Sequence, residues 1–524
     1  MASRSDELWA KIEAGRQYDL ELWEKYITVL EQENDLDRLI QAGEDLLRIF
    51  PLLHIFWTKY ASWVFKKDND AEQTVSIFET AVLKCPYVPQ MWLSFSEFIL
   101  YNKVEIPNPR NVLSRAVSKV GLFTNAVDLW EKWVIFEGQF DDTFDETVTD
   151  DFFSTPNFDH SAAMVRSFSL LLCSLVVPLN KSALLFSRCK ELISNLAVED
   201  LHRGAVLAVQ IGTALKFPSN FQSELESLST SLRQMTSSDL IFDRVYELYQ
   251  QTESVFKAKQ PFEVPLSRQW YTIKPLPEAQ LVGWRQYLLN EIKISSFEYV
   301  VSLFNRCLVP CADFLEFWVM FINYCNQNNR PRHVFERLMT CHEFLMTSSP
   351  DFRLITALQL EEIGDEPAAL QVYEILTQLF ETSPLVVARF ASFCARRQFP
   401  IPQWLSLLEK KVAQSPTSDQ KNALTLIAFR LLWSNYYKSN LEEVYSTTKK
   451  ILSETRGPIN YWVEVFSLSK LIPNFEGIFW LLETLKDFKS ELGPEFFVLI
   501  DIICEDVAIT SSPVIALKAQ SFKY

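Results

Sequence analysis

Glycine is scarce in this chain: 11 of the 524 residues are glycine, whereas ordinary usage of about 7% would supply roughly three times as many. Nucleotide-binding α/β folds use glycine in tight turns and in phosphate-binding loops. The patterns G-x-x-x-x-G-K-[ST], G-x-G-x-x-G, G-x-S-x-G and H-E-x-x-H do not occur in the sequence. These absences argue against the usual nucleotide-binding, hydrolase and zinc-protease chemistry. We therefore expect a protein that is not an enzyme and that binds no cofactor.

Histidine and cysteine form no metal-binding pattern. The five histidines and nine cysteines have no regular spacing, whereas a zinc site needs four converging ligands, typically in paired short spacings. The nearest approaches are Cys307 with Cys311, and the pair Cys341-His342 with His333 one helix away. We predict no metal site, and we interpret the cysteines as small core residues of a protein in a reducing compartment.

Positive charge is in deficit. Lysine and arginine total 50 against 66 aspartate and glutamate residues, which gives a net charge of −16 and a pI near 5.0. A molecule of this charge is repelled by phosphate backbones. Its basic pairs, such as Lys66-Lys67 and Arg396-Arg397, are isolated along the sequence. Any contact with RNA is therefore expected to be mostly indirect.

Long apolar runs are also missing. The longest charge-free apolar stretch lies between Arg166 and Lys181, is 14 residues long and contains Pro178. A helix needs about 20 apolar residues to cross a bilayer. The segment Met1–Glu7 leads directly into charged sequence rather than into an apolar signal. We expect a soluble intracellular protein without membrane contact.

Tryptophan, by contrast, recurs at a nearly constant spacing. The successive intervals are 34, 35 and 38 residues in one block and 34 in another, at Trp23, Trp57, Trp92 and Trp130, and at Trp284 and Trp318. Trp57 opens an aromatic triplet with Tyr60 and Trp63, and side chains at i, i+3 and i+6 stay on one broad face of a helix. We therefore place these six tryptophans in the core of a repeat rather than on an RNA-stacking surface.

Each aromatic triplet is followed by a second helical pattern. Residues 75–82 are the example after Trp57, and a proline such as Pro51 or Pro86 separates successive pairs. Proline suits the start of a helix better than its interior. One helix pair cannot bury its aromatic face alone, so neighbouring pairs must stack and share a continuous core. The predicted fold is all-α, an α-solenoid superhelix of TPR-like helix pairs.

The repeat pattern divides the chain into two arms and a junction. Residues 1–215 form an N-terminal arm, interrupted by an acidic segment, 138–160, that we interpret as an exposed loop. Residues 216–278 contain a Ser/Thr-rich stretch, an irregular helix and several prolines, and are predicted to be the junction. Residues 279–524 form a C-terminal arm whose last helix, near 494–508, is apolar. A terminal repeat should be polar outside, so this helix indicates a covered surface.

Some stretches resemble a known family. The pattern W-x-x-[aromatic]-x-x-[aromatic]-E, complete from Trp130 to Glu137, resembles the HAT (half-a-tetratricopeptide) repeat of RNA-processing scaffolds. Two central segments, 271–281 (YTIKPLPEAQL) and 304–312 (FNRCLVPCA), closely resemble the centre of the pre-mRNA-processing factor 39 and factor 42 family. The segment 50–61 is similar to the same family, so the likeness covers roughly residues 40–345.

The resemblance implies a non-enzymatic scaffold of the U1 small nuclear ribonucleoprotein (U1 snRNP), which recognises 5′ splice sites in the nucleus. It also implies a dimer through the C-terminal repeats, with itself or with a paralogous HAT-repeat protein, and an N-terminal arm that contacts other U1 proteins. Two alternatives stay open. One is a HAT scaffold of another complex, in mRNA 3′-end cleavage or ribosomal RNA processing; the other is a repeat protein that binds RNA directly.

The dimer interface is expected after about residue 420, because aromatic residues dominate interface energetics. The candidate anchors are aromatic residues of the last repeats: Trp433, Tyr436, Tyr437, Trp462, Phe466, Trp480, Phe496 and Phe497. The same spacing also fits core packing within a repeat, and for Trp433, Trp462 and Trp480 we favour that interpretation.

Overall fold

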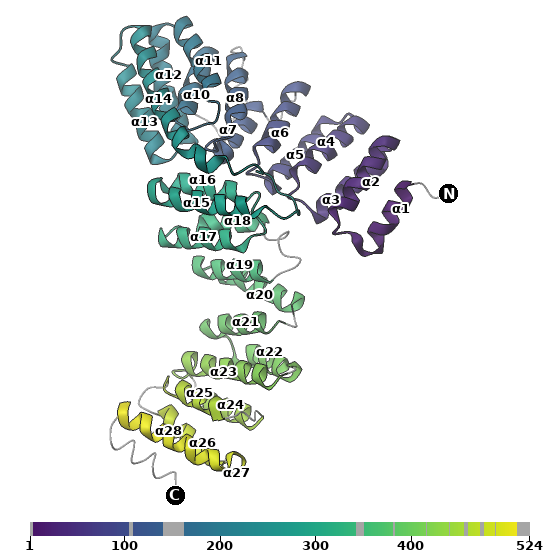
Figure 1. Ribbon diagram of the computed structural model, residues 1–524, viewed down its shortest axis with the longest axis vertical. Helices are drawn as coiled ribbons and strands as arrows, with labels where there is room; N and C mark the ends of the chain where they lie inside the picture. Colours follow the sequence, from purple (N-terminus) through teal and green to yellow (C-terminus); the bar gives the residue numbers. More distant parts are fainter. Residues whose placement is uncertain are drawn as a thin grey trace. The chain divides into compact units, whose positions relative to one another are not determined.

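The computed structural model describes residues 4–103, 108–139, 162–341, 350–380, 383–415, 417–439, 441–454, 459–471, 476–487 and 489–510. Within these ranges every regular element is a helix, and successive helices pair and stack (Figure 1). This confirms the prediction of an all-α solenoid of helix pairs. The acidic segment 138–160 lies outside the described residues except for its first two positions.

The chain divides into two compact units, Met1–Thr347 and Ser348–Tyr524. The first unit contains α1 (Arg4–Lys11), η1 (Ile12–Arg16), α2 (Leu20–Glu33), α3 (Leu36–Ile49), α4 (His54–Asp68), α5 (Ala71–Lys84), α6 (Pro89–Asn102), α7 (Pro109–Val120), α8 (Val127–Gln139), α10 (Ala163–Leu175), α11 (Ala183–Asn195), α12 (Val198–Ala214), α13 (Ser219–Leu232), α14 (Ser238–Glu263), α15 (Glu278–Ile294), α16 (Phe297–Cys307), α17 (Leu315–Gln327) and α18 (Arg332–Cys341).

The second unit continues the same pattern. It contains α19 (Asp351–Ile363), α20 (Glu366–Leu379), α21 (Pro384–Arg396), α22 (Ile401–Gln414), α23 (Ser418–Asn435), α24 (Leu441–Glu454), α25 (Ile459–Ser469), α26 (Glu476–Asp487), α27 (Lys489–Leu492) and α28 (Pro494–Thr510). The first unit thus includes helices α15 to α18, which the sequence analysis assigned to the second arm. A boundary between arms at 216–278 stays a prediction about the repeat array.

Short polar residues set the helix boundaries. The carboxylate of Asp70 accepts hydrogen bonds from the backbone N–H groups of Glu72 and Gln73, and Asp35 caps α3 in the same way. These caps satisfy donors that have no partner within the helix. Helices α2 and α4 end at Asn34 and Asn69, which adopt the left-handed conformation that asparagine tolerates. Tight, capped turns therefore hold the helices of a pair side by side.

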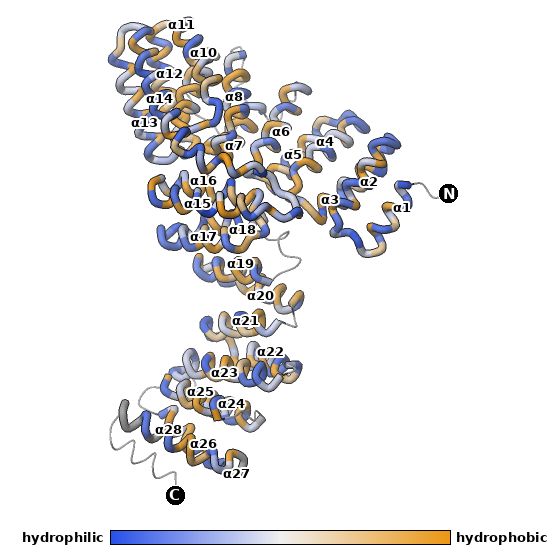
Figure 2. The backbone as a smooth tube through the Cα atoms, viewed as in Figure 1, coloured by the Kyte–Doolittle hydropathy of each residue, from blue (hydrophilic) through white to orange (hydrophobic). Residues whose placement is uncertain are grey.

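The repeated tryptophans lie in the core and tie each helix to the turn before it. All six are at most 8% exposed, and apolar residues gather where neighbouring helices face each other (Figure 2). Four indole N–H groups donate to the carbonyl six residues earlier, each at 2.8 Å: Trp23 to Gln17, Trp57 to Pro51, Trp92 to Pro86 and Trp318 to Ala312. Trp130 reaches the carbonyl of Gly121 at 2.9 Å. For Trp284, the described residues offer the indole nitrogen no hydrogen-bond partner.

His54 gives the stability of the first unit a specific pH dependence. It opens α4 and is 8% exposed, and burial lowers its pKa from 6.5 to about 4. Between these two values the unfolded chain binds a proton that the folded chain does not, so stability falls as the pH drops below 6.5. The free energy of unfolding is expected to be about 1 kcal/mol lower at pH 5.5 than at pH 7. Urea unfolding of wild type and of His54→Gln between pH 7 and 5.5 checks this, and equal pH slopes would contradict it.

Candidate interaction surfaces

A groove crosses the helices α4, α6 and α8, each of which is the first helix of its pair. It has a volume of about 700 Å³ and is lined by residues of α4, α5, α6 and α8. Phe65, Phe78 and Phe98 line it, with Phe98 at 5.1 Å from Phe65 and 5.4 Å from Phe78 between ring centroids. Tyr101 is 88% exposed at its wall, and Lys132 borders it. Aromatic walls with a few polar groups suit the side chains of a protein segment.

Ion pairs link several of the repeats to their neighbours. In the first unit Lys59 contacts Glu31 at 3.0 Å and Lys132 contacts Glu97 at 2.6 Å. Further pairs join adjacent repeats: Arg115–Glu79, Arg188–Glu131, Arg285–Glu316 and Arg330–Glu298 in the first unit, and Arg396–Glu361, Arg397–Glu366, Lys450–Glu409, Lys449–Asp487 and Lys470–Asp506 in the second. Exposed pairs contribute little stability. They do place a carboxylate beside each of these cations, which disfavours phosphate binding.

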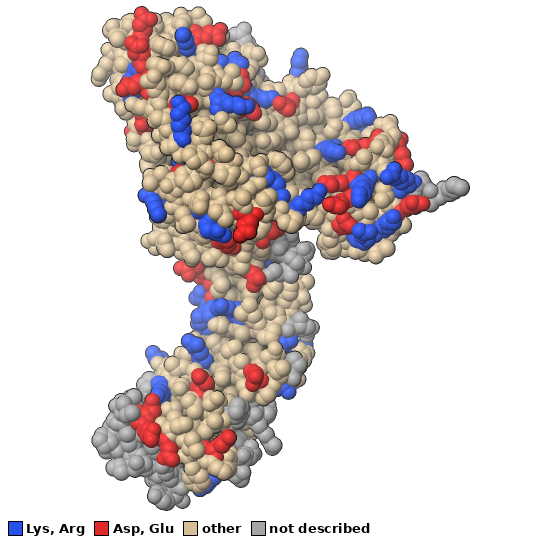
Figure 3. All heavy atoms as spheres, in the orientation of Figure 1, with Lys and Arg blue, Asp and Glu red and all other residues tan. Residues whose placement is uncertain are grey.

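Acidic and basic side chains are correspondingly interspersed over the face shown in Figure 3. A nucleic-acid groove would instead need a continuous basic stripe. On that face the described charges form no such stripe, and mostly indirect RNA contact stays a prediction.

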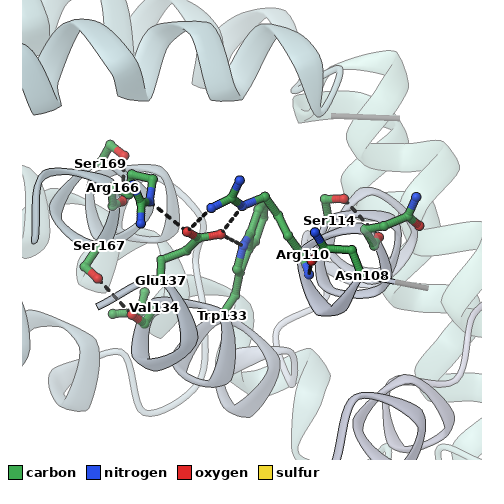
Figure 4. A network of polar contacts seen from close by, with 10 residues as sticks. Asn108, Arg110, Ser114, Trp133, Val134, Glu137, Arg166, Ser167 and Ser169 are labelled. Carbon is green, nitrogen blue, oxygen red and sulfur yellow. Dashed lines mark hydrogen bonds and ion pairs between the residues drawn. The ribbon is translucent and has the colours of Figure 1, made fainter. Parts of the chain in front are cut away.

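One carboxylate is buried completely, at the end of the α8 repeat motif. Glu137 is 0% exposed and lies between Arg110 of α7 and Arg166 of α10 (Figure 4). The Nε and Nη2 atoms of Arg110 donate to its two oxygens at 2.7 and 2.9 Å, and Nε of Arg166 donates at 2.9 Å. The Trp133 indole donates to the same carboxylate at 3.2 Å. Three helices thus meet at one carboxylate whose lone pairs are occupied, so its role is structural.

The position seven residues after each repeated tryptophan is buried throughout. Four of the six positions hold apolar residues, Leu30, Val64, Ile99 and Cys325, and two hold glutamate, Glu137 and Glu291. Glu291 pairs with Lys259 of the preceding helix α14 at 2.6 Å. These cations were not among the residues predicted from the sequence. The detectable signal was a glutamate at a position that is otherwise apolar, because a buried charge needs a partner.

Reactive cysteine and metal chemistry find no support among the described residues. The described cysteines that are free are all buried, and burial raises the pKa of the Cys325 and Cys394 thiols to about 12. Thiolates, the reactive form, are therefore rare at neutral pH. The described residues contain no cluster of three or more histidine, cysteine or acidic side chains suited to a metal ion. None of the described helices is long and apolar enough to span a membrane.

Most of the predicted dimer anchors pack inside the second unit. Five are buried, Trp433, Tyr436, Trp462, Phe466 and Phe496, while Tyr437 and Trp480 are partly buried. The Trp433 indole donates to the Thr448 hydroxyl at 2.9 Å, and Trp480 stacks on Tyr445 with 4.9 Å between centroids. Phe497, on α28, is 45% exposed. Of the eight candidates, Phe497 is therefore the most exposed, and the position of a dimer interface stays a prediction.

Comparison with known proteins places the chain in a family. Residues 6–153 match the family model described as PRP39 N-terminal HAT repeat, and residues 257–396 match PRP39 C-terminal HAT repeat. A relative from Xenopus laevis named "Pre-mRNA-processing factor 39" is 24% identical over 80% of this chain and 64% of its own length. Relatives of that name from Homo sapiens and Schizosaccharomyces pombe are 22% and 24% identical over 80% and 66% of this chain.

The chain spans 61% of the length of the human relative and 54% of the length of the Schizosaccharomyces pombe relative. The two family models together match more than half of the chain and follow each other in the same order as their names. The chain belongs to the PRP39 family of HAT-repeat proteins.

Proposed function

We propose that this chain is a non-catalytic scaffold of pre-mRNA splicing that joins proteins of the U1 snRNP at 5′ splice sites. The observation that carries the proposal is the match of both repeat blocks to the PRP39 family models. The relatives of this family are named pre-mRNA-processing factors, and a role in splicing implies that the protein works in the nucleus.

The surfaces described above support a scaffold that binds protein. The groove over α4, α6 and α8 combines aromatic walls with an exposed tyrosine, Tyr101, and aromatic side chains are enriched at protein interfaces. The ion pairs between repeats leave mixed charge rather than a basic stripe. Contact with U1 RNA would then pass mainly through partner proteins.

Purification of the tagged chain from cells, with sequencing of the bound RNA, tests the proposal. U1 RNA and U1 proteins are expected, and the double variant Phe98→Ala with Tyr101→Ala should reduce U1 protein recovery if the groove binds one of them. Recovery of 3′-end cleavage factors or of ribosomal RNA precursors instead would favour the alternative HAT scaffolds. Tight binding of naked RNA with a steep salt dependence would favour a direct RNA-binding protein.

We also infer that the repeats after about residue 420 join two copies, or one copy and a paralogue. The support is the apolar helix α28, where Phe497 and Val498 are 45% and 49% exposed. In a homodimer, Phe497→Glu should weaken self-association roughly tenfold or more, because a carboxylate would be buried in the interface.

Light scattering of the full chain over a concentration series measures this effect. Leu83→Glu is the matched control, because Leu83 is an equally apolar side chain that is 66% exposed on α5 of the first unit. A chain shortened to end near residue 420 should be monomeric. If the shortened chain still dimerises, the assignment of the interface is wrong.

A further inference from the structure

The segment 264–277 between α14 and α15 contacts elements that are distant in sequence. Nζ of Lys274 lies 3.8 Å from Glu21 of α2, and the Asn125 amide before α8 donates to Gln269 at 2.8 Å. On the other side, the Tyr271 hydroxyl donates to Asp313, in the turn before α17, at 3.3 Å. Figure 1 shows this segment running from α14 out toward the N-terminal repeats and back to α15.

The segment is also held in shape by its own contacts. The guanidinium of Arg268 donates to the carbonyls of Lys274 and Pro275 at 3.0 and 3.3 Å. The Gln280 side chain accepts from the backbone N–H of Arg268 at 3.1 Å and donates to the Ser267 hydroxyl at 2.8 Å. These bonds fix the segment as a folded strap rather than a flexible linker.

A buried ion pair anchors the start of the strap. Glu263, the last residue of α14, receives two hydrogen bonds from the Arg306 guanidinium of α16, at 2.7 and 2.6 Å. The Thr124 hydroxyl, between α7 and α8, donates to the same carboxylate at 3.0 Å. Arg306 is 4% exposed and its guanidinium lies 5.5 Å from the Trp284 ring centroid. One carboxylate therefore connects the N-terminal repeats, α14 and α16.

Both partners stay charged at neutral pH. Burial alone would raise the pKa of Glu263, but the charge and hydrogen bonds of Arg306 outweigh it and lower that pKa. Burial alone would lower the pKa of Arg306, and Glu263 reverses the direction. The pair is thus a permanent ionic contact across the two sets of repeats.

A second contact lies between α18 and the turn before α6. The Arg337 guanidinium is 4.7 Å from the ring centroid of Tyr87 and donates to the carbonyl of Leu308 at 3.1 Å. Tyr87, Tyr271, Leu308 and Arg337 are among the residues that line a space of only about 20 Å³, so the surfaces fit closely. Helix α5 packs on α18, and α7 packs on α16.

We propose that residues 263–277 form a clasp that holds the N-terminal repeats (α2–α8) and the repeats α15–α18 in one rigid body. A buried ion pair adds little net stability over an apolar contact but penalises other arrangements. Under this proposal residues 271–277 make their contacts within the chain rather than with a partner. The spacing between the partner surfaces of the two sets of repeats is then fixed before any partner binds. The proposal is independent of which complex the protein joins.

Hydrogen exchange of the full chain, read by mass spectrometry, tests the clasp. In Arg306→Met, backbone amides at 84–88 and 121–126 should exchange at least tenfold faster, while those of α10–α12 keep their rates. Small-angle scattering should show a larger radius of gyration. The matched control is Arg285→Met, since the Arg285–Glu316 pair is 42% exposed on both sides and links only the adjacent helices α15 and α17.

A second variant covers the case in which Arg306→Met does not fold. Gln269→Ala combined with Lys274→Ala removes two contacts of the strap with the N-terminal repeats and leaves no buried charge unpaired. Several-fold faster exchange at 121–126 with unchanged rates in α10–α12 would support the clasp. Unchanged exchange at 84–88 and 121–126, in whichever of the two variants folds, overturns it.

Discussion

Replacing Glu137 with alanine is expected to destabilise the first compact unit by about 3 to 5 kcal/mol, because removing one member of a buried ionic group leaves the charges of its partners buried and unpaired. Arg110 is at most 7% exposed and Arg166 at most 2%, so the two guanidinium groups would remain in the interior without their shared carboxylate. Because Arg110 lies on α7 and Arg166 on α10, the loss of stability would affect two repeats.

Guanidinium chloride unfolding followed by tryptophan fluorescence measures this loss. Glu97→Ala is the control: the Glu97 side chain is 61% exposed and pairs with Lys132 on the surface, so its removal should cost less than about 1 kcal/mol. The triple variant Arg110→Met, Glu137→Leu, Arg166→Met should recover much of the lost stability, because no charge is left unpaired. A loss below about 1 kcal/mol in Glu137→Ala would show that water reaches this site.

The core of each repeat could be predicted because it is a local property of the sequence. A tryptophan that opens an i, i+3, i+6 triplet must lie on one face of its helix, and the six repeated tryptophans are indeed buried. Their hydrogen bonds follow from the same locality. The indole of Trp57, for example, donates to Pro51, in the turn that precedes its own helix.

The contacts that organise the first unit could not be predicted in this way. Lys274 meets Glu21, and Glu263 meets both Thr124 and Arg306, across separations that no repeat period encodes. In the sequence the strap is a proline-rich interruption of the repeats, and such an interruption is compatible with a flexible hinge as well as with a folded strap. Only the packing of α14, α15 and α16 distinguishes these two possibilities.

The predicted dimer anchors show a second reason why sequence alone was insufficient. An aromatic residue at helical spacing fits the inside of a repeat and the surface of an interface equally well. Trp433, on α23, is buried and bonded to Thr448, whereas Phe497, on α28, is exposed. An aromatic residue belongs to the core or to an interface according to whether neighbouring helices cover its face of the helix. This coverage depends on tertiary packing.

The tryptophans allow the value of the indole hydrogen bond to be measured. Trp92→Ala should cost about 3 to 5 kcal/mol, as expected for a buried aromatic side chain reduced to a methyl group. Trp92→Phe keeps a ring in the core but removes the N–H that donates to the Pro86 carbonyl at 2.8 Å. A buried carbonyl left without its donor costs about 1 to 3 kcal/mol beyond the loss of ring volume.

Trp284→Phe is the matched comparison for Trp92→Phe. Both rings are at most 2% exposed, and each has an arginine guanidinium 5.5 Å from its centroid. The Trp284 indole nitrogen has no hydrogen-bond partner among the described residues. Replacing Trp284 with phenylalanine therefore removes ring volume but leaves no buried acceptor without its donor. Urea unfolding should therefore show Trp92→Phe as the more destabilising variant by about 1 to 2 kcal/mol. Equal losses would mean that the tryptophans hold the repeats together by packing alone, and that the recurring bond to the preceding turn only orients the ring.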